Sequence, residues 1–303
     1  MAHSHAEPQH HDFLSRINTA FFIAVSVNLG FTGIEAFYAI VTGSVSLLGD
    51  AGHNLSDVSG LLLAWGASYL AGKKSSRMYS YGYRRTTILA AIINALILVF
   101  AAAVIALQSI DRLLTPEPIQ EIPVMIVATI GIFVNAGTAM LFMQGGKQDL
   151  NLKAAYLHLA YDALISAAVV VTALLIFYTG LQWLDPLVGL FIVVVILAGT
   201  WNVLRDSVNL ILDAVPQHID RTAVEDYLRS IDGVTDIHDV HIWGMSTHEN
   251  GLTAHLIMPE DTLWDSNGGY TEISAELRRR FRIHHVTLQV EKDLDCANED
   301  CCD

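Results

Sequence analysis

Charged side chains are scarce in this chain. Asp, Glu, Lys and Arg make up 16% of its 303 residues, whereas hydrophobic residues make up 52%. The mean hydropathy of +0.42 is too high for an ordinary soluble domain of this length. The apolar residues gather in six stretches, each of which reaches the roughly 20 residues that a helix needs to cross a bilayer. These stretches are 17–41, 45–71, 86–110, 122–145, 154–180 and 184–204.

The composition therefore predicts an α-helical membrane protein with six transmembrane helices, surrounded by membrane lipid. A removable signal peptide is not expected, because residue 1 is not followed by a short apolar core and a small-residue cleavage site.

Basic residues are also few: 17 Lys and Arg stand against 31 Asp and Glu, for a net charge of −14. The excess is local, because the chain from Asp213 onward carries 19 acidic and 7 basic residues. Such a region repels nucleic acid and anionic lipid headgroups and attracts cations. We therefore expect no nucleic-acid partner.

The few basic residues are distributed unevenly between the predicted loops. Of the ten basic residues before Asp213, eight lie in or next to the loops after the second, fourth and sixth stretches: Lys73, Lys74, Arg77, Arg84, Arg85, Lys147, Lys153 and Arg205. The loops on the other side hold only Arg112. Because Lys and Arg accumulate in cytoplasmic loops, both termini are predicted to face the cytoplasm. The compact loops favour a bacterial inner membrane, although an organelle membrane would follow the same charge rule.

Cysteine is nearly absent. Cys296, Cys301 and Cys302 all lie in the last eight residues, on the predicted reducing side, where a structural disulfide is not favoured. This tail, 296–303, either binds a soft metal or is inert. The polar tail at 1–15 holds His3, His5, His10 and His11, and metal collection and chance composition both stay open for it.

After Val215–Pro216 the long apolar stretches end and the sequence takes on the mixed polar and apolar pattern of a soluble domain. Asp220 is a plausible N-cap for an amphipathic helix over 220–231, and strand-like runs follow in VTDIHDVHIW and LTAHLIM. A second helix at about 271–281 and a last strand, HHVTLQVE, complete an αββαβ order. The predicted organisation is a transmembrane domain at 16–213 and a small cytoplasmic α+β domain, ferredoxin-like, at 214–295.

The strongest motif lies inside the membrane region. LLGDAGHNLSD contains His53 and Asp57, and AYLHLAYDALIS contains His158 and Asp162, so the same four-residue spacing occurs in two spans. That spacing places both side chains on one helix face. An isolated ionised Asp at mid-membrane costs about 2.5–3.5 kcal/mol on insertion scales, so a doubled motif is hard to ascribe to packing. Two imidazoles and two carboxylates suit a tetrahedral site for Zn²⁺. Asp50, one turn before His53, is a candidate supporting ligand or cavity-lining group.

These paired motifs, the six spans and the αββαβ module resemble the cation diffusion facilitator family, in its zinc-exporting bacterial branch. YGYRRTTILAA at 81–91 and HDVHIW at 238–243 add to the resemblance. It implies a transporter rather than an enzyme, with His53, Asp57, His158 and Asp162 as the transport site. Zn²⁺ is the implied substrate, with Cd²⁺ and Co²⁺ as similar passengers. Because metal ligands must lose their protons to bind, alternating access to such a site would exchange Zn²⁺ for protons.

The resemblance also implies a metal site in a dimerising cytoplasmic domain, with His241, His255, His284 and Glu291 as ligands. In a regular strand His285, rather than His284, shares a face with Glu291, so the choice between these neighbours stays open. His238 is a further candidate ligand. A charge interlock of the family maps onto Arg85 and Asp213.

Two other functions compete with zinc export. An exporter of organic cations would use Asp50, Asp57 and Asp162 as charge partners, but the residues around the motif are small rather than aromatic. A membrane zinc sensor would signal through the C-terminal region without transport, but no catalytic or partner-docking domain is visible beyond residue 216.

Overall fold

The computed structural model describes residues 8–143, 150–259 and 269–292, with side chains described at 25–140, 156–259 and 269–292. The histidines of the N-terminal tail and Cys296, Cys301 and Cys302 lie outside the described side chains. The described chain forms two compact units. The first comprises residues up to Leu62 together with Asn94–Trp201, and the second comprises Leu63–Ile93 together with the chain from Asn202 onward.

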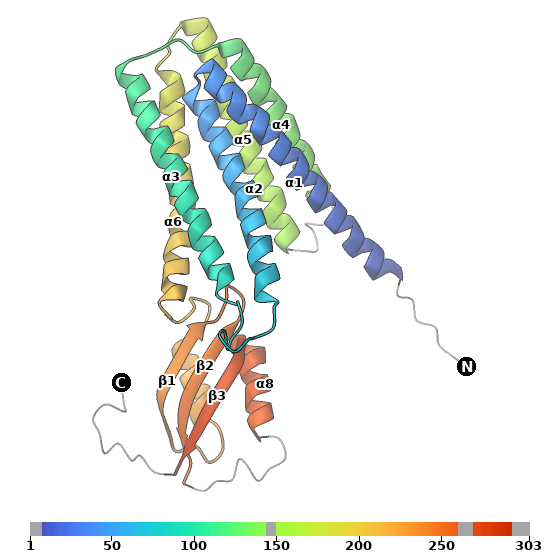
Figure 1. Ribbon diagram of the computed structural model, residues 1–303, viewed down its shortest axis with the longest axis vertical. Helices are drawn as coiled ribbons and strands as arrows, with labels where there is room; N and C mark the ends of the chain where they lie inside the picture. The colour runs from blue at the N-terminus through green and yellow to red at the C-terminus, as the bar shows by residue number, and fades with distance from the viewer. Residues whose placement is uncertain (1–7, 144–149, 260–268, 293–303) are drawn as a thin grey trace. The chain divides into compact units, whose positions relative to one another are not determined.

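Six long helices form the N-terminal two thirds of the described chain (Figure 1). Their bounds are α1 Pro8–Thr42, α2 Val45–Ala71, α3 Thr86–Leu114, α4 Glu121–Met143, α5 Leu150–Thr179 and α6 Leu184–Ile211. Helix α1 begins at Pro8, inside the stretch expected as a polar tail, and proline is well tolerated at a first helical position because its missing N–H is not needed there.

Five of the described helices, all except α2, are long and apolar enough to cross a membrane. Helix α2 has the length, with 27 residues, but Asp50, His53 and Asp57 lower its hydropathy. Large apolar side chains on these helices point outward, among them Phe37, Phe100 and Phe133. Such a surface requires lipid rather than water around it.

Within the first unit, α4 packs along α5 and α1 packs against α4. A core of small and branched side chains, including Leu47, Ala102, Val124 and Val169, fills the interior. The turns between helices meet at one end of the unit, where Asp185 at the start of α6 accepts hydrogen bonds from Ser44, Val45 and Ser46 at the start of α2. We call this the Asp185 end. Ser44 itself caps α2 by accepting from the Leu47 N–H.

The second unit contains the predicted αββαβ domain: α7 Arg221–Arg229, β1 Asp236–Gly244, β2 Asn250–Ile257, α8 Gly269–Phe281 and β3 Ile283–Glu291. Asp220 is the N-cap of α7, as predicted, and accepts from Thr222 and Ala223 N–H groups. The β1–β2 turn occupies 245–249, because Asn250 and Gly251 already pair with β1.

The three strands form a sheet in the order β1-β2-β3, with β1 and β2 antiparallel and β2 and β3 parallel. One face of the sheet packs on the helices: Ile242, Leu252 and Leu256 join Leu228 and Leu277 in the domain core. The alternation of strand side chains therefore turns the residues between them, most of them polar, toward the other face. We call this helix-free side the open face.

Candidate metal centre and its relatives

Helices α2 and α5 bring the two His-xxx-Asp motifs together within the first unit. His53 Nε2 lies 3.3 Å from Asp162 Oδ1, and His158 Nε2 lies 3.2 Å from Asp57 Oδ2. Within each helix the imidazole also faces its own carboxylate, at 3.8 Å for His53–Asp57 and 3.9 Å for His158–Asp162. Each imidazole thus approaches both carboxylates, and each carboxylate approaches both imidazoles. We call these four residues the ring.

The spacing of the ring suits a small divalent ion. Zinc bonds to imidazole nitrogen and carboxylate oxygen are about 2.0–2.2 Å long, so neighbouring ligands of a tetrahedral ion stand roughly 3.4 Å apart. The cross-helix separations of 3.2 and 3.3 Å are close to that value. His53, Asp57 and Asp162 can each offer a ligand atom within 4.8 Å of the others, and His158 approaches from the more exposed side.

Burial within the ring is uneven. The Asp162 side chain is 3% exposed, whereas that of His158 is 47% exposed. Asp57 Oδ2 and Asp162 Oδ1 are buried oxygens without a well-aligned hydrogen-bond donor. Such oxygens are costly to bury unless a proton or a cation satisfies them. The arrangement can therefore hold a cation in exchange for protons.

Asp50 lies outside the ring. It is fully buried and accepts a hydrogen bond from Ser166 at 2.7 Å. Glu35 of α1, also fully buried, accepts from the Asn54 amide at 3.0 Å.

A second cluster lies on the open face of the C-terminal domain. His238 and His255 are cross-strand partners with ring centroids 4.9 Å apart. Glu291 Oε2 is 3.0 Å from His238 Nε2, and Glu291 Oε1 is 3.0 Å from His255 Nδ1. These three residues can offer ligand atoms within 4.8 Å of one another. We call them the open-face cluster.

The pKa of Glu291 is lower than its ordinary value. Burial raises this pKa, but hydrogen bonding to His238 and Gln289 and the positive charge of His255 lower it by more. The carboxyl group is therefore deprotonated at neutral pH, the state that a metal requires.

The other expected ligands lie outside this three-residue cluster. His241 is linked to it through Asp239, whose carboxylate lies 2.7 Å from His241 Nε2 and 3.4 Å from His255 Nε2. His284 is the extra residue of a bulge in β3, and His285 contacts Tyr81 edge to face, with 5.3 Å between ring centroids. His285 does share a face with Glu291, but six residues of strand place them about 20 Å apart. His284, seven residues away, is farther still.

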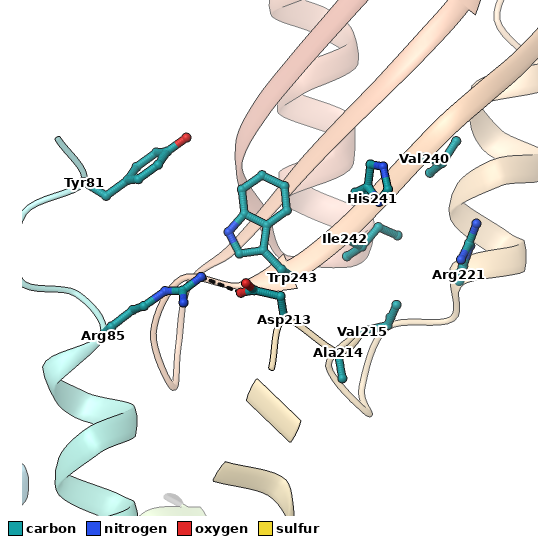
Figure 2. A pocket seen from close by; sticks show the side chains of 10 residues that line it. All are labelled: Tyr81, Arg85, Asp213, Ala214, Val215, Arg221, Val240, His241, Ile242 and Trp243. Carbon is teal, nitrogen blue, oxygen red and sulfur yellow. Dashed lines mark hydrogen bonds and ion pairs between the residues drawn. The ribbon is translucent and has the colours of Figure 1, made fainter. Parts of the chain in front are cut away.

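The Arg85–Asp213 ion pair expected from the sequence is present in the second unit. Asp213 follows the last turn of α6 with a positive φ of 58°, a helix-ending conformation that Asp tolerates. The pair borders a pocket of about 560 Å³, with Tyr81, His241 and Trp243 among its other lining residues (Figure 2).

Sequence reasoning missed two acidic residues with defined roles in these contacts, Asp185 and Asp239. The signal for Asp185 was its place at the start of an apolar stretch, where a carboxylate favours a helix N-terminus. Asp239, at a φ of 50°, gave no signal, because HDVHIW reads as an unbroken strand.

Two family models match the chain. The cation efflux transmembrane domain matches residues 21–212, and the cation efflux protein cytoplasmic domain matches residues 216–293.

Full-length relatives agree with these models. The chain is 35% identical to the cadmium, cobalt and zinc/H⁺-K⁺ antiporter of Bacillus subtilis (strain 168), over 87% of this chain and 86% of the relative. It is 32% identical to the zinc transporter ZitB of Escherichia coli (strain K12), over 99% of this chain and 96% of that protein. It is 33% identical to the metal cation efflux system protein CzcD of Cupriavidus metallidurans, over 89% and 85%. The chain therefore belongs to the cation efflux, or cation diffusion facilitator, family, whose members are membrane transporters and not enzymes.

Proposed function

We propose that this protein exports Zn²⁺ from the cytoplasm in exchange for protons, with Cd²⁺ and Co²⁺ as chemically similar substrates. The observation that carries the proposal is the ring, in which two imidazoles and two carboxylates from α2 and α5 meet at 3.2 to 3.9 Å. The names of the relatives, which transport zinc, cadmium or cobalt, support the choice of substrate.

The exchange follows from competition for the same atoms. A histidine nitrogen that binds Zn²⁺ must give up its proton, so high proton concentration expels the metal. Cytoplasmic Zn²⁺ displaces protons from the ring, and protons from the opposite side displace Zn²⁺ once the ring opens there. Alternating access then converts the proton gradient into export.

The same proposal assigns the sides of the membrane. Lys and Arg in the loops after α2 and α4 support an orientation in the inner membrane with both termini in the cytoplasm. The Asp185 end then faces outward. The C-terminal domain forms a homodimer, which is supported by the family model named ZT_dimer that it matches.

Purified protein in liposomes tests the exchange. With an acidic interior and Zn²⁺ outside, a trapped zinc reporter and a trapped pH dye are expected to record Zn²⁺ entry and proton exit together. Dissipating the pH step with a protonophore should slow Zn²⁺ entry. A rate of Zn²⁺ entry that does not depend on the pH step would argue against this function, as would transport of organic cations instead of zinc.

The open-face cluster is proposed to bind a metal ion in the cytoplasmic domain. Replacement of His238 by alanine is expected to remove about one equivalent of bound Zn²⁺ per chain, because it deletes one of three converging ligands. Equilibrium dialysis of the full chain in detergent, followed by elemental analysis, measures the loss.

His284→Ala is the matched control, since His284 lies on the β3 bulge away from the cluster. It is expected to keep the full complement of metal. If His284→Ala lost the metal and His238→Ala kept it, the ligand set first inferred from the family resemblance would be favoured.

The Arg85–Asp213 pair is proposed to act as the interlock between the start of α3 and the end of α6. Both side chains are 51% exposed, so the pair contributes only about 0.2–1 kcal/mol. Arg85→Glu is expected to reduce zinc flux by several-fold, because it places two negative charges together. The exchanged pair, Arg85→Glu with Asp213→Arg, should recover most of the flux in the liposome measurement. A swapped pair no better than the single variant would show that the ion pair itself is not needed.

A further inference from the structure

Two buried carboxyl groups, Glu35 and Asp50, lie beside the ring but are not members of it. Glu35 of α1 and Asp50 of α2 both have 0% exposure. Neither has an Arg or Lys partner among the described ion pairs. A membrane helix carries such groups only at considerable cost, and they usually mark a path for protons or ions.

The contacts of these two groups leave one oxygen open on each. Asn54 donates to Glu35 Oε2 and Ser166 donates to Asp50 Oδ2. Glu35 Oε1 and Asp50 Oδ1 are buried and receive no N–H or O–H donor. Asn54, which donates to Glu35, follows Asp50 by four residues and so shares its face of α2, which brings the two carboxyl groups close together in the interior. A single proton held between them would satisfy both open oxygens and remove one of two adjacent negative charges.

The pair also has a defined position along the helices. Asp50 precedes His53 by three residues, and Ser166 follows Asp162 by four, so the pair stands about one helical turn from the ring on both helices. That turn lies toward the Asp185 end, where α2 begins and α5 ends. The ionisable groups that act on the pair are His53 and Asp162 of the ring.

We propose that Glu35 and Asp50 share one proton and form the station through which the coupling proton passes between the ring and the Asp185 end. The inference rests on the proposed function, proton-coupled zinc exchange, and adds the residues that deliver the proton. They do not bind zinc themselves.

The charge balance of the exchange supports this role. When Zn²⁺ occupies the ring, its two positive charges one turn away favour loss of the shared proton, which leaves toward the Asp185 end. When Zn²⁺ departs, no cation offsets the two adjacent negative charges, and the carboxylates bind a proton that arrives from that end. This proton then passes to a histidine of the empty ring, and the pair is reprotonated.

Two zinc fluxes separate proton delivery from zinc binding. Net Zn²⁺ entry driven by a pH step requires the protonated, zinc-free return of the transporter. Exchange of radioactive Zn²⁺ for unlabelled Zn²⁺ at equal pH does not, because the ring is loaded in both directions. In liposomes, Glu35→Gln and Asp50→Asn are therefore expected to lower pH-driven net entry at least about tenfold. Zinc-for-zinc exchange should stay within about threefold of the unchanged protein.

Three further variants serve as controls. Glu35→Asp retains an ionisable group and is expected to keep most of the pH-driven flux. Glu121→Gln and Asp111→Asn make the same chemical changes at carboxyl groups outside both the pair and the ring, and should keep both fluxes. Replacing K⁺ by choline on both sides should change neither flux if the pair carries protons.

The outcomes are distinct. If the unchanged protein shows no pH-driven zinc flux, proton-coupled exchange itself fails. If that flux is present and survives in Glu35→Gln and Asp50→Asn, the proton station is refuted while exchange stands. Equal loss of both fluxes would assign the pair a structural role instead. Loss of a K⁺-dependent flux alone would assign it to K⁺, and either result overturns the proposal.

Discussion

Asp162→Asn is expected to lower zinc transport at least about a hundredfold, the largest functional effect predicted for a single substitution in this chain. Asp162 is the most buried member of the ring, and its two oxygens face His53 and His158 separately. Asparagine has nearly the same size but is a neutral and weaker ligand. It cannot offset the charge of Zn²⁺ in an apolar surrounding, where an unpaired charge is costly. Zinc entry into liposomes and zinc binding in detergent measure the loss.

Asp111→Asn provides the control for this substitution. Asp111 is an exposed residue near the end of α3, and its variant is expected to transport at the unchanged rate. Transport by Asp162→Asn within a few-fold of that control would remove the ring from the mechanism, whatever its geometry.

Asp185→Ala is expected to produce the largest loss of stability, about 3–5 kcal/mol. Asp185 is buried, with 2% of the residue exposed. It accepts from the hydroxyl groups of Ser44 and Ser46 and from the N–H groups of Val45 and Ser46. Alanine leaves these buried donors without an acceptor and releases the start of α2 from α6. Thermal unfolding of the detergent-solubilised protein should fall by roughly 10 °C.

Two comparisons make this result specific. Asp185→Asn keeps an acceptor oxygen and is expected to lose less than half as much, whereas Asp111→Ala should leave the midpoint unchanged. An Asp185→Ala protein with an unaltered midpoint would mean that Ser44 alone holds the start of α2.

Part of the transport site can be predicted from the sequence alone. A four-residue spacing on a helix places two side chains on one face whatever surrounds the helix, because each residue turns by about 100°. The His-xxx-Asp pairs of α2 and α5 could therefore be recognised as potential ligand pairs. That the two faces meet, with cross-helix distances of 3.2 and 3.3 Å, came from the packing of the bundle.

The full membership of the open-face cluster, in contrast, could not be predicted from the sequence. Strand alternation predicts faces only while the strand is regular, and both outer strands contain bulges. The irregularity between His238 and His241, at Asp239, returns both histidines to the open face and leaves His238 opposite His255. A bulge depends on the local backbone conformation, and the residue types in HDVHIW do not predict one. The sequence therefore favours His241 over His238 as a ligand, and only the pairing of the strands brings His238 beside His255.

The amino-acid sequence alone determined the long apolar helices, the αββαβ order and the pairs of residues that share a helix face, because these depend on composition and on periods of a few residues. Only the tertiary structure decided which faces meet. Three contacts join residues that are remote in the chain. Asp185 of α6 binds the start of α2, Asn54 binds Glu35, and Glu291 joins His238 and His255 in the open-face cluster. Such contacts are selected by how whole helices and strands pack, and no local spacing encodes that choice.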